Sequence, residues 1–300
     1  MKICCILNDK SGSAALVDQQ TIVDLFSKHG VSVDILQMRD GTSISDLANQ
    51  AAQQDYDIIV AGGGDGTVNA VAAALVGHPT SRLGVLPLGT LNHFARDLGI
   101  PTEVPQAIAI ICGGQSKAVD VGVVNDRYFL NNSSLGLYPA IVKLRERLQS
   151  AGYTKWLAML FSSLRILSAF RQFELEIQPS TGGSIKCKTA LLFVGNNAYE
   201  TSVAKLGTRL AIDRGLLWVN MPRHPTLMGL AMGLLALIFR REKPMDTLIF
   251  EATSLKVRSN KQLLTVAADG EVLHLKTPLN YRILPRALNV MVHAPQSETK

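Results

Sequence analysis

The apolar positions of the chain follow two different patterns, and the change comes near residue 120. Before that point, short continuous apolar runs are typical of strands that are buried on both faces of a sheet. These runs are Ile3–Leu7, Val31–Leu36, Ile58–Ala61 and Leu83–Leu86. Apolar residues at helical spacing lie between them. Repeated strand–helix units predict a parallel sheet with right-handed crossovers.

Four helices are predicted in this first part of the chain. The first ends at Gly30, a glycine in the position that commonly follows a helix. The second begins after Ser43, whose hydroxyl can cap it. The third and fourth are expected over Ala70–Val76 and Asn92–Leu98.

After residue 120, strand-like runs follow one another mostly without helices. Asn125-Asp126 separates two such runs and predicts a hairpin. The later runs are Phe173–Ile177, Lys188–Val194, Leu216–Val219, Leu255–Ser259, Leu263–Ala267 and Tyr281–Leu284. This pattern favours an antiparallel β domain. We therefore expect domains at residues 1–125 and 126–294, and a flexible tail at 295–300.

Two apolar stretches in the second half need separate interpretation. Tyr153–Phe173 also carries basic residues and predicts an amphipathic helix. Leu227–Phe239 is apolar throughout, but it is shorter than the roughly 20 residues that a membrane span requires. Arg240, Arg241 and Lys243 follow it. It is interpreted as a buried helix or as a surface that touches lipid.

Composition narrows the class of protein. The 300 residues are 47% hydrophobic and 18% charged, which provides a sizeable core and excludes general disorder. The net charge of +6 fits an anionic partner such as a nucleotide, a nucleic acid or an acidic lipid surface. Few aromatic residues and no basic run argue against nucleic acid. The four cysteines form no disulfide framework and no secretory signal opens the chain, so we expect a cytoplasmic protein, peripheral at the inner membrane face.

The glycine-rich segment Gly62–Thr67 carries the strongest chemical signal. It follows a predicted strand and precedes a predicted helix, so its backbone N–H groups and the helix N-terminus can approach a phosphate. Asp65 would repel the phosphate unless Mg²⁺ or water lies between them. The segment is not a Walker A loop. Asn69 occupies the last glycine position of the dinucleotide fingerprint, which argues against hydride transfer.

Two other loops are expected at the same edge of the sheet, where open α/β folds bind ligands. The loop after the first strand contains Asn8, Ser11 and Gly12. The loop after the fourth strand is Gly89–Asn92. Their convergence with Gly62–Thr67 supports a phosphate site.

Two acidic motifs lie further along the chain. The first motif is Ala268-Asp269-Gly270-Glu271, which lies between two strand-like runs. By itself it predicts a hairpin turn, because Asp-Gly is common in such turns. Asp120-Val121-Gly122 lies at the expected domain boundary. Neither motif assigns a chemistry by itself.

The order and spacing of these motifs resemble the diacylglycerol kinase catalytic-domain family, which includes bacterial lipid kinases, sphingosine kinases and ceramide kinases. The motifs are GGGDGT, PLGT-x-N-x-FAR-x-LGIP, DVG and DGE, and the resemblance extends from Ile3 to about Val292. It implies a Rossmann-like nucleotide-binding α/β domain, an antiparallel β-sandwich domain and a cleft between them. It also implies ATP- and Mg²⁺-dependent phosphorylation of a diacylglycerol-like or sphingoid lipid hydroxyl.

The resemblance implies roles for individual residues. Asp269 would be the general base, which a weakly nucleophilic lipid hydroxyl requires. Asp65, Asp120 and Glu271 would organise Mg²⁺ and water. The nucleotide would be held by Asn8, Ser11, Gly12, Gly63, Gly64, Asp65, Gly66, Thr67 and Thr90. The expected partners are a lipid substrate and, reversibly, an anionic membrane surface, but no nucleic acid; a homodimer stays open.

The chain departs from the family pattern at three places. Asp9 replaces the proline of the usual Asn-Pro-x-Ser-Gly loop, and His93 stands where many members have aspartate. The family often has Asp-Asp-Gly at a structural metal site, where this chain has Asp213-Arg214-Gly215. Arg214 places a cation where a ligand is expected, and Asp213 is left as a candidate metal ligand.

Two alternative functions stay open. A kinase of a soluble substrate such as NAD shares a similar glycine-rich loop, although the PLGT and DGE motifs favour a lipid. A nucleotide or lipid sensor without catalytic activity would account for His93 and Arg214, although the intact acidic residues argue against it.

Overall fold

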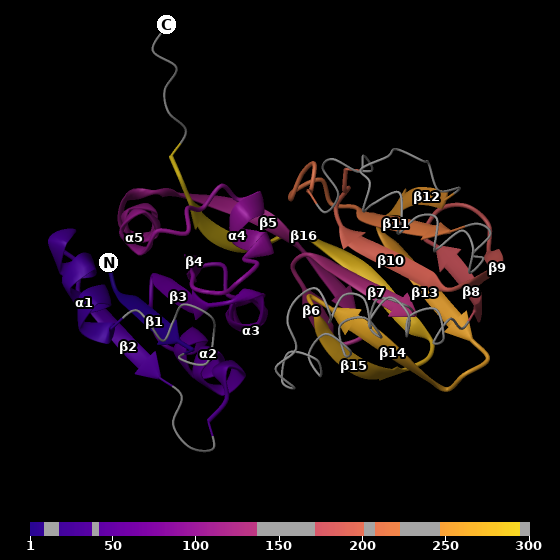
Figure 1. Ribbon diagram of the computed structural model, residues 1–300, viewed down its shortest axis with the longest axis horizontal. Helices are drawn as coiled ribbons and strands as arrows, with labels where there is room; N and C mark the ends of the chain where they lie inside the picture. The colour runs from indigo at the N-terminus through magenta and orange to yellow at the C-terminus, as the bar shows by residue number, and fades with distance from the viewer. Residues whose placement is uncertain (9–17, 38–41, 137–171, 201–207, 223–246, 295–300) are drawn as a thin grey trace, which may run out of the picture. The chain divides into compact units, whose positions relative to one another are not determined.

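A computed structural model describes residues 1–8, 18–37, 42–136, 172–200, 208–222 and 247–294 (Figure 1). The chain forms two compact units. The first contains Met1–Val121 and Pro285–Lys300, and the second contains Gly122–Leu284. The first unit is α/β with parallel strands, and the second consists of antiparallel strands, which confirms the expected fold class.

The first unit is built on four parallel strands in the order β2-β1-β3-β4. Their bounds are Ile3–Leu7 for β1, Val33–Gln37 for β2, Ile58–Gly63 for β3 and Arg82–Pro87 for β4. Every residue of β1 and β3 is buried, because these central strands are covered on both faces. The prediction of β1 and β3 from their continuous apolar sequences is therefore confirmed.

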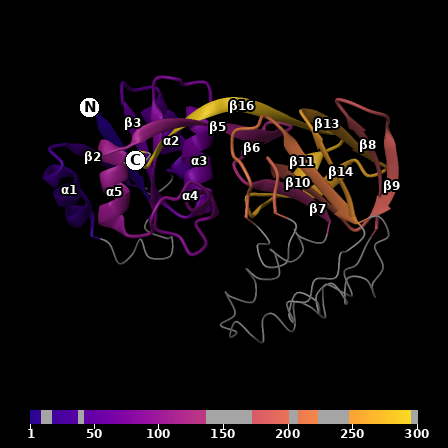
Figure 2. The same cartoon turned by 90° about the horizontal axis from the view of Figure 1, so that it is seen from above.

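In the described part of this unit, five helices accompany the sheet: α1 (Gln19–Lys28), α2 (Ile44–Ala52), α3 (Asp65–Leu75), α4 (His93–Asp97) and α5 (Val104–Gly113). α1 packs beside α5 (Figure 2), and α2 packs beside α3. The predicted caps are confirmed. Gly30 follows α1 with a φ of 71°, and the Ser43 hydroxyl accepts the Asp46 N–H at 3.1 Å. α5 was not predicted, because its mostly apolar sequence lacks helical alternation.

The order in which the chain adds strands to this sheet reverses after β2. From β1 it moves outward to β2, and from β2 it crosses back past β1 to β3 and β4. Right-handed crossovers then place α1 on one face and α2 and α3 on the other. The carboxyl ends of β1 and β3 meet at this switch point, which is where such folds bind ligands.

The second unit contains two antiparallel sheets. One joins β13, β8, β9 and the first part of β16, and the other has the order β12-β11-β10-β7-β14-β15. The bounds are β5 Gln115–Val124, β6 Arg127–Phe129, β7 Asn132–Gly136, β8 Phe173–Pro179, β9 Ile185–Thr189, β10 Leu191–Asn196, β11 Leu217–Pro222, β12 Thr247–Ala252, β13 Ser254–Ser259, β14 Leu263–Ala268, β15 Glu271–Lys276 and β16 Leu279–Val292.

The two sheets bury one common core. Ile177 and Val257 come from the first sheet, and Val194, Val219 and Val266 from the second; all five are fully buried. Alternate residues of each strand point into this core, as period-two sequences require. The predicted hairpin is confirmed by the antiparallel pairing of β5 and β6, in which Val124 faces Arg127.

Several boundaries differ from expectation. Lys188–Val194 is not one strand but the parts of β9 and β10 on either side of a break at Ala190. The units divide at 121/122 rather than 125/126. Residues 285–294, expected in the second domain, return to the first unit, because the end of β16 pairs with β4 through Val290 and Leu83.

The two apolar stretches considered for membrane contact lie at residues 153–171 and 227–239, outside the described residues. Phe173 belongs to β8 rather than to a helix. Among the residues that the structure describes, no helix is long and apolar enough to cross a membrane.

Candidate functional site

The glycine-rich segment is shorter as a loop than its sequence suggests. Gly62 and Gly63 are the last residues of β3, and Asp65 is already the first residue of α3. Gly64 alone joins strand to helix. No side chain among the described residues caps the helix, so the first-turn N–H groups, which lack partners within the helix, face the carboxyl edge of the sheet.

Asn8 connects the ends of the two central strands. Its amide nitrogen Nδ2 donates to the Thr67 hydroxyl at 3.0 Å, and its backbone N–H donates to the Gly62 carbonyl at 3.0 Å. Thr67 is 4% exposed, so its hydroxyl serves the packing of the loop as well as any ligand. Asn8 therefore fixes the floor of the predicted phosphate site.

The loop after β4 touches the glycine turn. A Cβ atom at Gly89 would overlap the Cα of Gly64, so the close approach requires glycine. Asn92, at a φ of 48°, holds this loop through bonds to the Gly89 N–H at 3.0 Å and the Pro87 carbonyl at 3.0 Å. The expected convergence of these two loops is present.

Asp65 has a structural contact in addition to its predicted role. Its Oδ1 lies 3.4 Å from the N–H of Phe94, near the start of α4, and its charge favours the N-terminus of α3. The carboxylate is half-buried. Mg²⁺ in nucleotide sites is commonly held by one or two carboxylates and the phosphates. Asp65 fits that donor set.

Asp120 is placed differently. It is 1% exposed, and its Oδ1 accepts the backbone N–H of Arg286 at 2.8 Å. Arg286 has a φ of 50°, so this bond supports an unusual bend in β16. Of the two carboxylates predicted for this unit, Asp65 is the one with exposed surface.

Other predicted residues of the first unit lie at its surface or outside the described chain. Thr90 and His93 are exposed. Ser11 and Gly12 lie outside the described residues. Within either unit, the described residues contain no group of three or more His, Cys, Asp or Glu side chains placed to hold a metal ion.

Asp269 lies in the second unit, in the predicted hairpin turn. Ala268 pairs with Glu271, and Asp269 and Gly270 form the two-residue loop, with φ values of 46° and 86°. Both values are positive, as a type I′ turn requires. The predicted turn at Asp269-Gly270 is thus confirmed.

The turn directs the Asp269 carboxylate onto a neighbouring backbone segment. Oδ2 accepts the N–H of Leu130 at 2.6 Å, and Oδ1 accepts the N–H of Asn131 at 2.8 Å and of Asn132 at 3.1 Å. Burial raises the pKa of this carboxyl above its usual range, although the three N–H groups and the charge of Arg209 act to lower it. A raised pKa makes the ionised group a better proton acceptor.

Glu271 and Asp213 are both exposed. Glu271 begins β15, directly after the turn. Beside Asp213, the backbone N–H of Arg214 donates to Oδ1 of the buried Asn197 at 3.0 Å. Asn197 therefore shapes the loop that carries the Asp-Arg-Gly sequence.

The sequence of the catalytic domain of diacylglycerol kinases matches residues 2–124. This first part of the chain is therefore similar to that catalytic domain. The match covers the glycine turn, the loop after β4 and Asp120, whereas Asp269 and Glu271 lie beyond it.

Individual relatives extend the likeness beyond this domain, over nearly the whole chain. A Yersinia enterocolitica protein named "Probable lipid kinase YegS-like" is 29% identical over 94% of each chain. A "Diacylglycerol kinase" of Staphylococcus carnosus is 41% identical over 90 residues, which are 30% of this chain and 29% of the relative. A solved diacylglycerol kinase structure from Bacillus anthracis has a TM-score of 0.69 at 21% identity, over 97% of both chains, and shares the fold.

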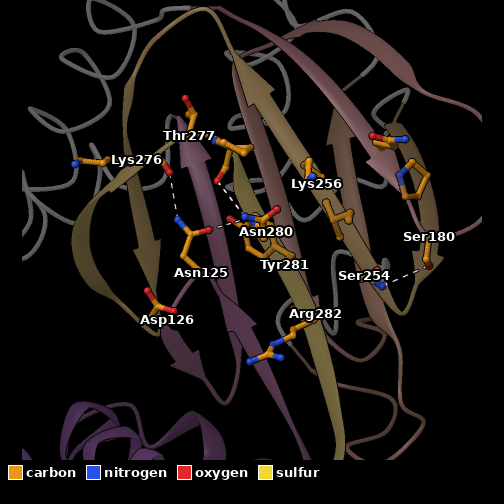
Figure 3. A pocket seen from close by; sticks show the side chains of 14 residues that line it. Asn125, Asp126, Ser180, Ser254, Lys256, Lys276, Thr277, Asn280, Tyr281 and Arg282 are labelled. Atoms are coloured by element: carbon orange, nitrogen blue, oxygen red, sulfur yellow. Dashed lines mark hydrogen bonds between the residues drawn. The ribbon is translucent and has the colours of Figure 1, made fainter.

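The second unit also carries a polar groove (Figure 3). The groove has a volume of about 880 Å³, and its lining includes Lys256, Lys276 and Arg282. Asn125 lies between Lys276 and Asn280 and bonds to the backbone of both (Figure 3). None of the predicted catalytic or nucleotide residues lines this groove.

Several residues around Asp269 were not identified from the sequence. Leu130–Asn132 supply the bonds to its carboxylate, and Asn196, Tyr199 and Arg209 lie buried around that segment. The one available signal was the occurrence of adjacent asparagines at strand ends, at Asn131-Asn132 and Asn196-Asn197.

Proposed function

We propose that the protein is a lipid kinase that transfers the γ-phosphate of ATP to a hydroxyl of a diacylglycerol-like or sphingoid lipid. The N-terminus of α3 lies at the switch point and carries this proposal, because it offers several backbone N–H groups to a phosphate and no described side chain caps it. The lipid acceptor is supported by the names of the relatives. Phosphoryl transfer depends mainly on positioning and charge neutralisation, which such a site supplies.

The nucleotide is held in this proposal by the first unit. Gly63, Gly64, Gly66 and Thr67 supply backbone and hydroxyl donors, and Asn8, Ser11, Gly12 and Thr90 are proposed to contribute further contacts. Asp65 holds Mg²⁺, which neutralises charge on the phosphates when it is bound. Asp120 and Glu271 are proposed to organise water around this centre.

Asp269 acts as the general base. It accepts the proton of the lipid hydroxyl while the hydroxyl oxygen forms its bond to the γ-phosphorus. The bond from that phosphorus to the β–γ bridging oxygen breaks, and ADP leaves with the electron pair. Three backbone N–H bonds orient the carboxylate, and its raised pKa favours acceptance of the proton.

The proposal includes reversible contact with an anionic membrane, where a lipid substrate resides. The polar groove on the second unit supports this contact, because its lining includes basic side chains. Among the described residues, Lys256, Lys276 and Arg282 form no ion pair, and Asp126 is the one carboxylate in the lining. Unpaired cations near an anionic surface each contribute about 1 kcal/mol to binding.

Transfer of label from γ-labelled ATP, with Mg²⁺ present, tests the proposal. The acceptors are diacylglycerol, ceramide and sphingosine in mixed micelles, with NAD and no acceptor as controls. We expect label in a lipid. Label in NAD alone would favour a soluble-substrate kinase, and nucleotide binding without any transfer would favour a sensor.

A further inference from the structure

The backbone segment that holds Asp269 is itself held from its other side. The Leu130 carbonyl accepts hydrogen bonds from Nδ2 of Asn196 at 2.8 Å and from Nη1 of Arg209 at 2.5 Å. The Asn131 carbonyl accepts the Tyr199 hydroxyl at 3.0 Å and the Asn196 N–H at 2.9 Å. The segment therefore donates with its N–H groups to a carboxylate while its carbonyls receive buried donors.

Arg209 is an unusual component of this arrangement, because it is a cation that is only 8% exposed. Its backbone bridges that of Tyr199, so the two donors come from one short antiparallel pair. A buried cation is strongly unfavourable unless a nearby anion and hydrogen bonds compensate it. The negative charge of the Asp269 carboxylate interacts with Arg209.

We propose that Arg209 is a positioning residue for Asp269. Its guanidinium fixes the backbone of Leu130–Asn132, and that backbone orients the carboxylate for the incoming hydroxyl. Its charge also offsets the negative charge of the half-buried carboxylate. Tyr199 assists by holding the next carbonyl along the segment.

This inference rests on the proposed function, in which Asp269 takes the proton of the acceptor. Proton transfer in the transition state requires the base within hydrogen-bond reach of the hydroxyl. Small displacements of a reacting group reduce the rate substantially. Loosening the segment should therefore lower kcat while leaving nucleotide binding, which belongs to the first unit, unaffected.

Three variants of the full chain test the inference. Arg209→Met removes the charge and the donors, and Arg209→Lys keeps the charge without the planar fork. Tyr199→Phe removes one hydroxyl and keeps the ring that packs on Phe193 and Trp218. Lys188→Met is the control, because it removes an exposed cation, paired with Glu174 at 2.7 Å, from the same unit.

We expect Arg209→Met to lower kcat at least about tenfold, as for loss of a charged hydrogen bond, and Tyr199→Phe about fivefold. Arg209→Lys should recover part of the loss. The KM for ATP should stay unchanged throughout, and Lys188→Met should match the wild type. Wild-type kcat in folded Arg209→Met, or an equal fall of kcat in Lys188→Met, would overturn the inference.

Hydrogen exchange of the 130–132 amides, measured by mass spectrometry, gives a readout independent of activity. We expect faster exchange in Tyr199→Phe and Arg209→Met than in Lys188→Met. If the wild type phosphorylates no acceptor, the proposed function fails, and the exchange result still decides whether Arg209 fixes the segment. If Arg209→Met does not fold, Tyr199→Phe decides: unchanged exchange and kcat would contradict the inference.

Discussion

Oδ2 of Asp269 accepts the backbone N–H of Leu130 at 2.6 Å, and this bond changes how substitutions of Asp269 must be interpreted. In Asp269→Asn, one side-chain atom becomes an NH₂ group. If the amide oxygen serves the two N–H groups of Asn131 and Asn132, the NH₂ faces the Leu130 N–H. Two donors then oppose each other, so asparagine is not a silent replacement here.

We expect Asp269→Asn to lower kcat at least about a hundredfold, since general-base catalysis contributes roughly a hundred- to ten-thousandfold. The unfolding free energy should also fall by about 1–3 kcal/mol, the cost of an unsatisfied buried donor. Steady-state kinetics and urea unfolding measure the two effects. The KM for ATP should change little.

Glu271→Gln is the matched comparison, because Glu271 is exposed and close in sequence. If Glu271→Gln loses kcat while Asp269→Asn keeps it, Glu271 is the base. If neither variant affects kcat, the Asp-Gly sequence is a turn without a catalytic role.

Asp65→Ala tests the phosphate site. Turnover should be abolished, because the variant lacks the half-buried carboxylate that is proposed to hold Mg²⁺. The fold should remain, since loss of a first-turn acid costs about 0.3–1 kcal/mol. Kinetics and thermal melting check both parts. A wild-type kcat in Asp65→Ala would refute the assignment.

Gly89→Ala tests the contact between the two loops. The new Cβ would overlap Gly64, so we expect the loops to separate and the KM for ATP to rise at least about fivefold, given that overpacking costs about 1–3 kcal/mol. Gly113→Ala is the control, because a Cβ there meets nothing within 4 Å. Equal KM values in the two variants would contradict a nucleotide site at this contact.

The Asp213-Arg214-Gly215 loop should bind no structural Mg²⁺ tightly. Arg214 places a cation beside the exposed Asp213, and the loop is already held by Asn197. Chelator should therefore leave the melting temperature of the nucleotide-free protein unchanged. A large chelator-induced decrease would show that Asp213 and its neighbours do hold a metal ion.

Membrane contact should depend on charge. Co-sedimentation with anionic vesicles should weaken as salt increases, because the attraction between exposed charges is screened. Replacing Lys256, Lys276 and Arg282 together by serine should weaken binding up to about 150-fold, at about 1 kcal/mol per cation.

Two comparisons locate the contact on the surface. Lys188→Ser, in an exposed ion pair, should bind like the wild type. If the triple variant also binds like the wild type while replacement of Arg240, Arg241 and Lys243 abolishes binding, the contact belongs to residues 227–243 rather than to the groove. Binding that does not respond to salt would exclude an electrostatic contact through the groove and through residues 227–243 alike.

The sequence alone determined the features that depend on local pattern. The buried strands β1 and β3 follow from continuous apolar runs, because both faces are covered. Ser43 and Gly30 were identified as helix ends because capping is a short-range interaction. The Asp269-Gly270 turn was predicted because it requires positive φ values, which Asp and Gly adopt more readily than most residue types.

Tertiary structure decided what depends on contacts between distant residues. The carboxylate of Asp269 is held by N–H groups about 140 positions away in the chain, a separation that no periodicity encodes. The return of β16 to the first unit depends on its pairing with β4, since a strand's sequence does not specify its neighbour. Arg209 looks like an ordinary surface cation in sequence, and only packing shows it buried beside Leu130.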